Sequence, residues 1–298
     1  MLIVNCQLLV DMKRVLILGG TAEASKLVAK ASKIDGLEAI ASLAGRTRKP
    51  QLSSTPTRIG GFGGVSGLTD YLREQHIDLL VDATHPFAAE ISFNAVIAAA
   101  RARIPHLILV RPPWEKTHGD RWIEVESNEE AAEVLSQLGH RRIFLTIGRQ
   151  ELAAYSRLQE FWFLMRAINP PPPQIPLPPG KLLTKRGPFS LDEERSLLQK
   201  YEIEVIVSKN SGGDATYAKI IAARELSIPV VIIKRPPLPQ GERVGDEESA
   251  MFWLQKQVKK PGFLKKPGFW NTQKPGFWDT EKGNGLGIFS LLTSTSSY

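Results

Sequence analysis

The sequence has little cysteine and histidine, and it lacks long apolar runs. Cys6 is the single cysteine among 298 residues, so no internal disulfide can form, and the five histidines show no paired zinc-ligand spacing. Polar residues break the apolar runs well short of the roughly 20 residues that cross a bilayer. These absences predict a protein of the reducing cytoplasm, without a structural metal and without contact with a membrane.

A strong excess of positive charge is also missing from most of the chain. The formal net charge is +7, but residues 259–298 hold six lysines against Asp279 and Glu281, which leaves +3 for residues 1–258. Nucleic acid is therefore not an expected partner. Apolar residues make up 42% of the chain and charged residues 23%, which is typical of a compact soluble protein.

The two ends of the sequence differ from the rest. Residues 1–11 are apolar but lack the basic segment and cleavage site of a signal peptide, so we expect an N-terminal extension, with Met12 as an alternative start. Residues 259–298 carry KPGF three times and predict a flexible tail. The alternative is that its lysines and aromatic residues bind a membrane surface, an acidic partner such as another enzyme of a pathway, or RNA.

Between these ends, short apolar runs alternate with helical patterns, which indicates an α/β fold with parallel sheets. The predicted strands cover residues 14–18, 38–43, 78–82, 106–110, 142–147, 161–167, 203–208 and 229–233. The predicted helices cover residues 22–33, 67–75, 88–102, 128–138, 190–200, 214–226 and 246–257. Ser127 followed by Glu130 predicts a capping box, and the seven prolines between Pro170 and Pro179 predict a surface loop.

A weak internal repeat suggests duplication. The segment that ends in Arg111-Pro112-Pro113 resembles the segment that ends in Arg235-Pro236-Pro237 when shifted by 124 residues. Two such units predict two similar sheets with a ligand cleft between the carboxyl edges of their strands. The predicted domains are residues 12–115 and 116–258. The alternative is chance similarity between two units of one large sheet.

Glycines and basic residues follow the first two predicted strands. Gly19, Gly20 and Thr21 stand between a strand and a helix, where backbone N–H groups can hold the phosphates of a dinucleotide. The spacing is not the full G-x-G-x-x-G pattern, so a tight turn without a ligand is the alternative. Gly45, Arg46 and Thr47 follow the second strand, where donors favour a 2′-phosphate and hence NADP over NAD.

Further polar turns lie at the ends of later strands. Phe62, flanked by glycines, could stack on a flat ring or plug the core. Thr84 and His85 follow a predicted strand, and His85 could donate a hydrogen bond or a proton, or be structural. Three predicted turns of the second domain are rich in hydrogen-bond donors, and they predict a substrate with several carboxylates or phosphates. One of these donor-rich turns could instead be an ordinary surface turn. The candidate residues of the three turns are Arg149, Lys185, Arg186, Lys209, Asn210, Ser211 and Gly212.

Taken in order, ILGGTAEA, SLAGRT, RIGGFGG, VDATHPFA, TIGRQ, TKRGPF and SKNSGG resemble the precorrin-6A reductase family of cobalamin biosynthesis, over about Lys13 to Val258. The resemblance implies two Rossmann-like domains with the active site between them. It also implies NADPH-dependent reduction of one double bond of precorrin-6A, or of its cobalt-bearing form, to precorrin-6B. Gly19, Gly20, Thr21, Arg46, Thr47, Thr84 and His85 would then line the cofactor, and the residues of the donor-rich turns would meet the carboxylates of the tetrapyrrole.

The proton donor stays open at this point, with His85, Lys209, Tyr217 and water as candidates. Two other functions also remain open. One is an NADP-dependent reductase or epimerase of a different anionic substrate. The other is a sensor that holds NADPH without chemistry.

Overall fold

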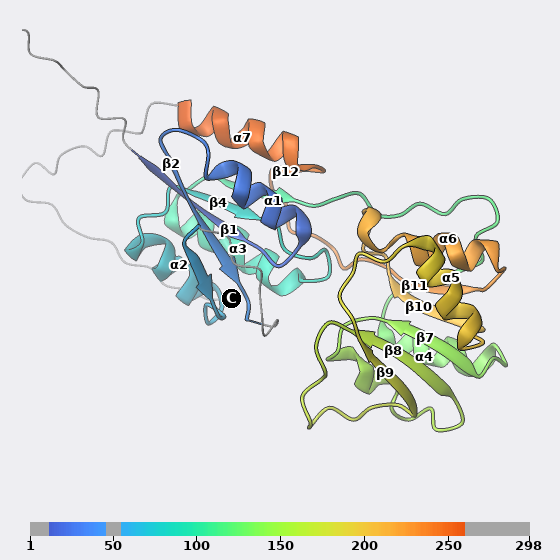
Figure 1. The fold of residues 1–298 in the computed structure, drawn as a ribbon. Coiled ribbons are helices and arrows are strands. Elements are labelled where there is room, and N and C mark those ends of the chain that lie inside the picture. Colours follow the sequence, from blue (N-terminus) through green and yellow to red (C-terminus); the bar gives the residue numbers. More distant parts are fainter. Residues whose placement is uncertain (1–11, 46–54, 260–298) are drawn as a thin grey trace, which may run out of the picture. The chain divides into compact units, whose positions relative to one another are not determined.

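The first of two parallel sheets is built mainly from the N-terminal part of the chain. The computed structural model describes residues 12–45 and 55–259, and the strand order in this sheet is β12-β5-β4-β1-β2-β3 (Figure 1). Its elements are β1 (Lys13–Leu18), α1 (Ala22–Ala31), β2 (Leu37–Leu43), β3 (Thr57–Ile59), α2 (Gly64–Glu74), β4 (Leu79–Asp82), α3 (Ala89–Ala102), β5 (His106–Leu109), β12 (Arg243–Val244) and α7 (Glu247–Lys259).

The second sheet is also parallel, with the order β6-β11-β10-β7-β8-β9. Its elements are β6 (Trp122–Val125), α4 (Asn128–Gln137), β7 (Arg142–Thr146), the 3₁₀ helix η1 (Glu151–Tyr155), β8 (Trp162–Ala167), β9 (Gly180–Thr184), α5 (Leu191–Lys200), β10 (Val205–Lys209), the 3₁₀ helix η2 (Asp214–Thr216), α6 (Ala218–Glu225) and β11 (Val230–Ile233).

Each sheet takes its sixth strand from the other half of the sequence. β6 follows β5 along the chain but pairs with β11, and β12 follows β11 but pairs with β5. The chain therefore passes between the sheets twice, once through Arg111-Pro112-Pro113 and once through Arg235-Pro236-Pro237. The pairings join β12 and α7 to the first sheet, although the sequence analysis assigned residues 116–258 to the second domain.

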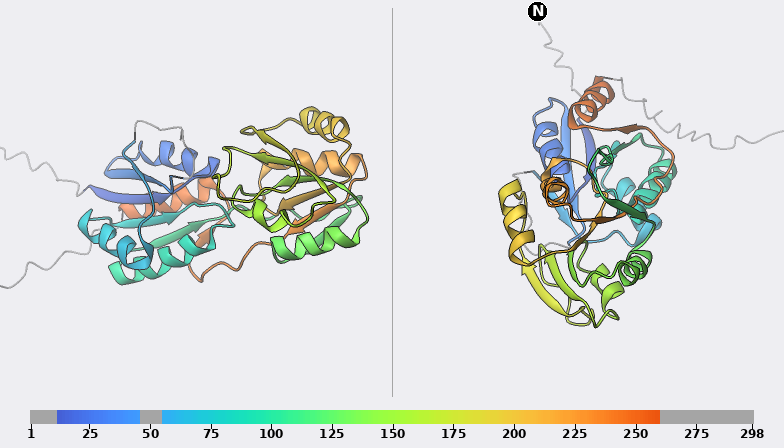
Figure 2. Two further views of the ribbon diagram at one scale, coloured as in Figure 1. Left: turned by 90° about the horizontal axis from the view of Figure 1, so that it is seen from below. Right: turned by 90° about the vertical axis from the view of Figure 1, so that its right-hand side faces the viewer.

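Both faces of each sheet are covered by helices, as the two views of Figure 2 show. In β1, Val15 and Ile17 pack in the cluster with α1 and α7, while Leu16 and Leu18 pack in the cluster with α2 and α3. Alternate side chains of a strand point to opposite faces, so burial on both faces requires a continuous apolar run. The second sheet repeats this pattern, with α4 and η1 on one face and α5 and α6 on the other.

The expected α/β fold with two parallel sheets is confirmed. The eight predicted strands are present, and the structure adds β3, β6, β9 and β12. Ser127 caps α4 by accepting from the Glu130 N–H, but the Glu130 carboxylate accepts from Glu126 rather than from Ser127. Residues 170–179 contain no helix or strand, as the prolines predict.

Parts of the sequence predictions concern residues that the structure does not describe, namely the extension of residues 1–11 and nearly all of the KPGF tail. Within residues 12–45 and 55–259, no helix has the length and apolar character needed to cross a membrane. The same ranges contain no group of three or more His, Cys, Asp or Glu side chains arranged to hold a metal ion. All of these described residues belong to a single compact unit.

Candidate active site

The turn after β1 exposes backbone at the N-terminus of α1. Gly20 has φ +117°, a conformation that L side chains rarely adopt, and a Cβ built there would meet no atom within 4 Å. The Thr21 hydroxyl accepts from the Ala24 N–H at 3.1 Å and donates to the Ala83 carbonyl at 2.9 Å. Thr21 therefore fixes the turn to the end of β4, and open space remains beside Gly20.

The basic loop after β2 is described only at its start. Gly45 has φ +73° and follows β2 at the same edge of the sheet. Arg46 and Thr47, the residues predicted to meet a 2′-phosphate, lie outside the described residues.

Arg58 organises the glycine-rich loop after β3. Its guanidinium donates to the carbonyls of Gly60 and Gly61, and the Phe62 ring centroid lies 3.8 Å from its Cζ. Phe62 also meets Tyr71 edge to face at 5.3 Å and packs against the core beneath α2. This position fits the alternative in which Phe62 packs into the core. Arg58 was not among the residues predicted from the sequence.

The end of β4 carries a buried carboxylate. Asp82 is 1% exposed, and its Oδ1 accepts from the Thr84 N–H at 3.0 Å and the Thr84 hydroxyl at 2.6 Å. Asp82 Oδ2 is buried and has no hydrogen-bond partner among the described residues. The Thr84 hydroxyl, predicted to face a cofactor, is thus turned toward Asp82.

His85 follows in the same turn and lies among cations. Burial lowers the pKa of His85 to about 3, with further contributions from Arg111, Lys209 and Arg235. Its Nδ1 accepts from the Phe87 N–H at 3.3 Å, so the ring proton of the neutral imidazole lies on Nε2. At neutral pH His85 is therefore a hydrogen-bond donor and not an imidazolium acid.

This assignment predicts how stability depends on pH. An unfolded histidine titrates near pH 6.5 and the folded His85 near 3, so its contribution is complete above 6.5 and is lost as pH falls toward 3. The loss reaches about 1.4 kcal/mol per pH unit. His85→Gln should make the stability of the chain fall less between about pH 7.5 and about pH 5.5, as measured by urea unfolding.

The exposed His118 provides the control, since His118→Gln should leave the wild-type pH dependence in place. An unchanged slope in His85→Gln would contradict a neutral, half-buried His85.

Lys209, at the end of β10, is held by a carboxylate. Its Nζ forms an ion pair with Glu151 Oε1 and lies 4.8 Å from the centroid of the Phe87 ring. Glu151 Oε2 accepts from the Gly148 N–H at 2.8 Å, which closes the turn after β7. In that turn the predicted Arg149 donates to the Pro170 carbonyl at 3.1 Å. Glu151 thus joins two of the three donor-rich turns, and no signal in the sequence pointed to it.

The third donor-rich turn, after β9, is more open. Lys185 is 61% exposed and lies 3.3 Å from Glu193 Oε1, and Arg186 is exposed. Phe189 packs 3.8 Å from the guanidinium of Arg166. The turn therefore presents cations at the surface while Phe189 anchors it below.

The turn after β10 is fixed by two arginines. Arg111 Nε donates to the carbonyls of Ser211 and Gly212 at 2.8 and 3.0 Å. Arg235 donates to the carbonyls of Asn210 and Ser211 at 2.8 and 2.9 Å. Since C=O and N–H point in opposite directions across a planar peptide, the N–H groups of the two residues after Ser211 point away from the arginines. This geometry is typical of an anion-binding turn.

Asn210 and Tyr217 have structural contacts as well. The Asn210 amide accepts from the Trp114 N–H at 2.8 Å and donates to the Trp114 carbonyl at 3.0 Å. The Tyr217 hydroxyl accepts from Arg224 at 3.0 Å and keeps its own proton to donate. Asn210 therefore holds the crossing after β5, and its predicted contact with substrate gains no support from this geometry.

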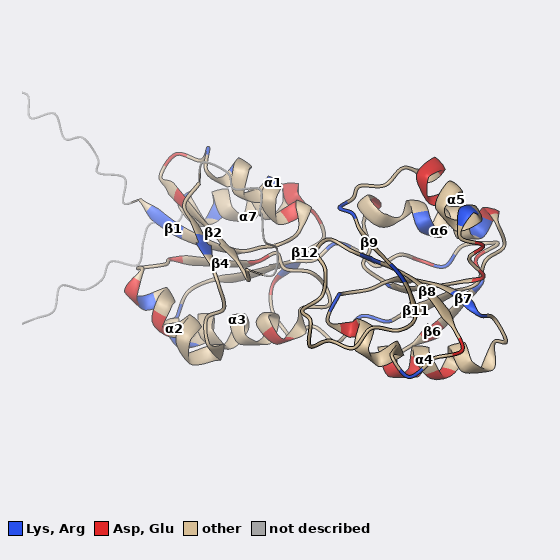
Figure 3. Cartoon of the chain, turned by 60° about the horizontal axis from the view of Figure 1, so that its bottom comes forward, with Lys and Arg blue, Asp and Glu red and all other residues tan. Residues whose placement is uncertain are grey.

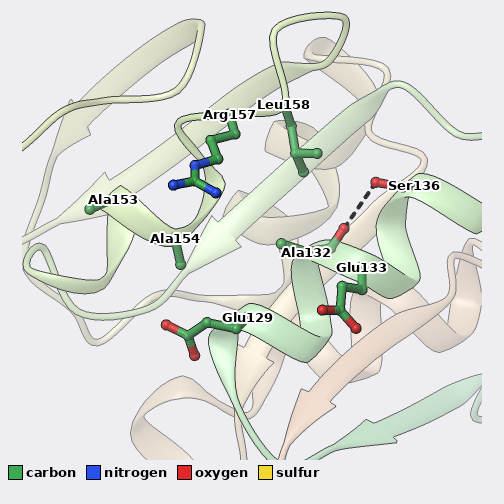
Figure 4. Close-up of a pocket in the computed structure, with 8 residues that line it drawn as sticks. All are labelled: Glu129, Ala132, Glu133, Ser136, Ala153, Ala154, Arg157 and Leu158. Atoms are coloured by element: carbon green, nitrogen blue, oxygen red, sulfur yellow. Dashed lines mark hydrogen bonds between the residues drawn. The ribbon is translucent and has the colours of Figure 1, made fainter.

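A cavity of about 510 Å³ lies between α4 and η1, and its lining includes none of the turn residues described above (Figure 4). Glu129 and Glu133 line it from α4, and Arg157 lies on the opposite side. Red segments in Figure 3 mark the acidic residues of α4. A cavity lined by two carboxylates does not suit an anionic substrate, so the turns remain the candidate site.

The fold and the site define a class, namely α/β proteins with two parallel sheets whose glycine turns and basic side chains follow the ends of the strands. The model of the family "Precorrin-6x reductase CbiJ/CobK" matches residues 14–255. The chain belongs to this family.

Three similar proteins agree with this. The precorrin-6A reductase of Rhodococcus erythropolis is 50% identical over 244 residues, 82% of this chain and 98% of that protein. The cobalt-precorrin-6A reductase of Priestia megaterium is 28% identical over 256 residues, which cover 82% of this chain and 99% of that protein. A solved structure of CobK precorrin-6A reductase shares 42% identity at a TM-score of 0.77, covering 82% of this chain and 97% of that one.

Proposed function

We propose that the chain reduces one double bond of precorrin-6A with NADPH and releases precorrin-6B, as a step of cobalamin biosynthesis. The observation that carries the proposal is the open backbone at Gly20, where α1 begins, at the edge of the sheet that also carries His85. The metal-free substrate is favoured because identity is 50% to a precorrin-6A reductase and 28% to a cobalt-precorrin-6A reductase.

The residues of the first sheet fit a dinucleotide. The first turn of α1 offers N–H donors and a positive dipole end, and the absence of a side chain at Gly20 leaves room for phosphate. Bound NADPH would supply a hydride. Gly19, Gly20 and Thr21 would hold the diphosphate, Gly45, Arg46 and Thr47 the 2′-phosphate and ribose, and Thr84 and His85 the part nearer the reacting carbon.

The turns of the second sheet fit the carboxylates of a tetrapyrrole. Exposed cations at Lys185 and Arg186 and the N–H groups that follow Ser211 are donors of the kind that bind carboxylate. Lys209 lies close enough to Phe87, two residues after His85, to join the substrate turns to the cofactor turn. Arg149 belongs to the same group by its place after β7.

The reaction adds a hydride to one ring carbon and a proton to its neighbour, while NADPH becomes NADP⁺. His85 is neutral at the pH of the reaction, so we assign it a hydrogen bond to the ligand and not the transfer of the proton. Lys209, held by Glu151, and Tyr217, whose hydroxyl proton is free to donate, remain as donors beside water.

Isotope transfer separates the proposal from its two alternatives. With NADPH deuterated at the transferred position, a precorrin-6A reductase yields a product with one deuterium and a stoichiometric amount of NADP⁺. An epimerase, which returns the hydride, yields no net NADP⁺. A sensor gives neither product, and oxidation with a different acid but not with precorrin-6A would favour the other reductase.

The choice of NADPH over NADH is tested at Arg46. Arg46→Ala should weaken NADPH binding by about 1 to 3 kcal/mol, because a charge-assisted bond to the 2′-phosphate is lost. NADH affinity should stay close to wild type in the same fluorescence titrations. Equal losses for both nucleotides would contradict the assignment of Arg46.

The same proposal assigns the reaction to the cytoplasm, in keeping with the single cysteine.

Contacts between the KPGF tail and other pathway enzymes remain a proposal. Removal of residues 259–298 and recovery of partners from a cell extract would test it.

A further inference from the structure

Arg111 connects the cofactor helix to the substrate turn. Its Nη1 lies 2.8 Å from Glu23 Oε2 in the first turn of α1, and its Nε donates to the carbonyls of Ser211 and Gly212. Its side chain is 17% exposed and that of Glu23 27%, so solvent screens the pair only in part. We propose that Arg111 is a positioning residue that couples binding of the dinucleotide to binding of the tetrapyrrole, an inference that rests on the proposed function.

Arg111 is closely packed against the turn after β10. A Cβ at Gly213 would lie 2.7 Å from Arg111 Cδ and 3.6 Å from Glu23 Oε1, and Gly213 has φ +69°. Any side chain at Gly213 would therefore contact both members of the ion pair, so the turn packs close to them. A shift of Glu23 has to move Arg111, and with it the carbonyls that orient the turn.

Arg235 holds Arg111 from the other side. It occupies the equivalent position of the repeat, and it donates to the Arg111 carbonyl at 2.7 Å and to the Pro112 carbonyl at 3.1 Å. Burial, followed by the charge of Arg111, lowers the pKa of Arg235 to about 10, so Arg235 stays charged at neutral pH. The two chain crossings are thus joined to each other and to the turn after β10.

Glu23 gives this connection a role in binding. A carboxylate in the first turn of α1 would repel a diphosphate at the same helix end, and its ion pair with Arg111 offsets that repulsion. A dinucleotide that orders this turn also orders Arg111 and the carbonyls of the substrate turn. Binding of the second ligand then costs less conformational entropy, because its turn is already ordered. This is the condition for positive coupling.

The test is a titration of NADP⁺ into the full chain, with and without saturating precorrin-6A. NADP⁺ cannot donate a hydride, so binding is measured without turnover. In the wild-type chain precorrin-6A should tighten NADP⁺ binding by about fivefold or more. In Arg111→Lys the ratio of the two dissociation constants should fall to near one, because one ammonium cannot bridge Glu23 and two carbonyls at once.

Two further variants separate coupling from damage to the fold. Glu23→Gln keeps the contacts of Arg111 with the turn and should lose the coupling as well, while the double variant should lose no more than either single one. Arg195→Lys alters an exposed ion pair on α5 and should keep the wild-type ratio. A wild-type ratio in Arg111→Lys, or a ratio of one in the wild-type chain, would overturn the inference and leave the proposed function standing. Failure of the wild-type chain to bind NADP⁺ at all would overturn both.

Discussion

Glu194→Gln is expected to lower the free energy of unfolding by about 3 to 5 kcal/mol. Glu194 is 0% exposed in its side chain and accepts from Arg166 at 2.7 and 3.0 Å, and Arg166 is 7% exposed. Removing the carboxylate charge leaves a buried guanidinium without its counter-ion. Lys219, whose pKa falls to about 7 mainly through burial and then through Arg166, would face that unpaired charge.

A more exposed ion pair, between α5 and α6, is the control. Arg195 and Glu225 lie 2.7 Å apart with side chains 34% and 40% exposed. Glu225→Gln should therefore cost no more than about 1 kcal/mol in the same urea unfolding experiments. Equal costs for the two variants would show that the Arg166 pair contributes no more than a surface contact. The effect also bears on the site, because Arg166 supports Phe189 beneath the turn of Lys185 and Arg186.

Gly20→Ala is expected to weaken NADPH binding by about 100-fold, or about 2.8 kcal/mol. The added methyl would occupy the open space beside the start of α1, and the backbone at φ +117° would be strained by any side chain. A titration with NADPH followed by fluorescence measures the loss. The thermal unfolding temperature of the same variant reports the cost of the strain alone.

Gly139→Ala separates these two effects. Gly139 also has a positive φ, +72°, and open space around its Cβ position, but it lies between α4 and β7. This variant should lose some stability and bind NADPH as the wild-type chain does. Wild-type NADPH affinity in Gly20→Ala would contradict the assignment of this turn to the phosphates.

The sequence predicted the buried strands well because burial on both faces leaves a continuous apolar run, as in β1 and β11. The missed strands are short or lie toward the edge of a sheet. β3 has three residues and β12 two, too few for a periodic pattern. The exchange of β6 and β12 between the sheets leaves no local signal, since it depends on pairing with strands far away in the sequence.

The candidate site was predicted at the level of turns and less well at the level of side chains. Parallel strands end at one edge, so glycines and cations after strands identified the turns. The neutral state of His85 depends first on burial and then on the charges of Arg111, Lys209 and Arg235. These side chains come from distant parts of the sequence, so the neutral state could not be foreseen. The internal repeat did align Arg111 with Arg235. That both donate hydrogen bonds to the turn after β10 is seen only in the structure.

The central claim is that this chain uses NADPH to reduce precorrin-6A, and a single-turnover experiment tests it most directly. Purified full-length protein is mixed with NADPH and precorrin-6A without oxygen, and NADPH absorbance and product mass are followed together. The account predicts that NADPH is consumed only when precorrin-6A is present, that the product gains two hydrogens, and that NADH reacts far more slowly. A chain that binds both ligands and yet leaves NADPH and precorrin-6A unchanged would contradict it.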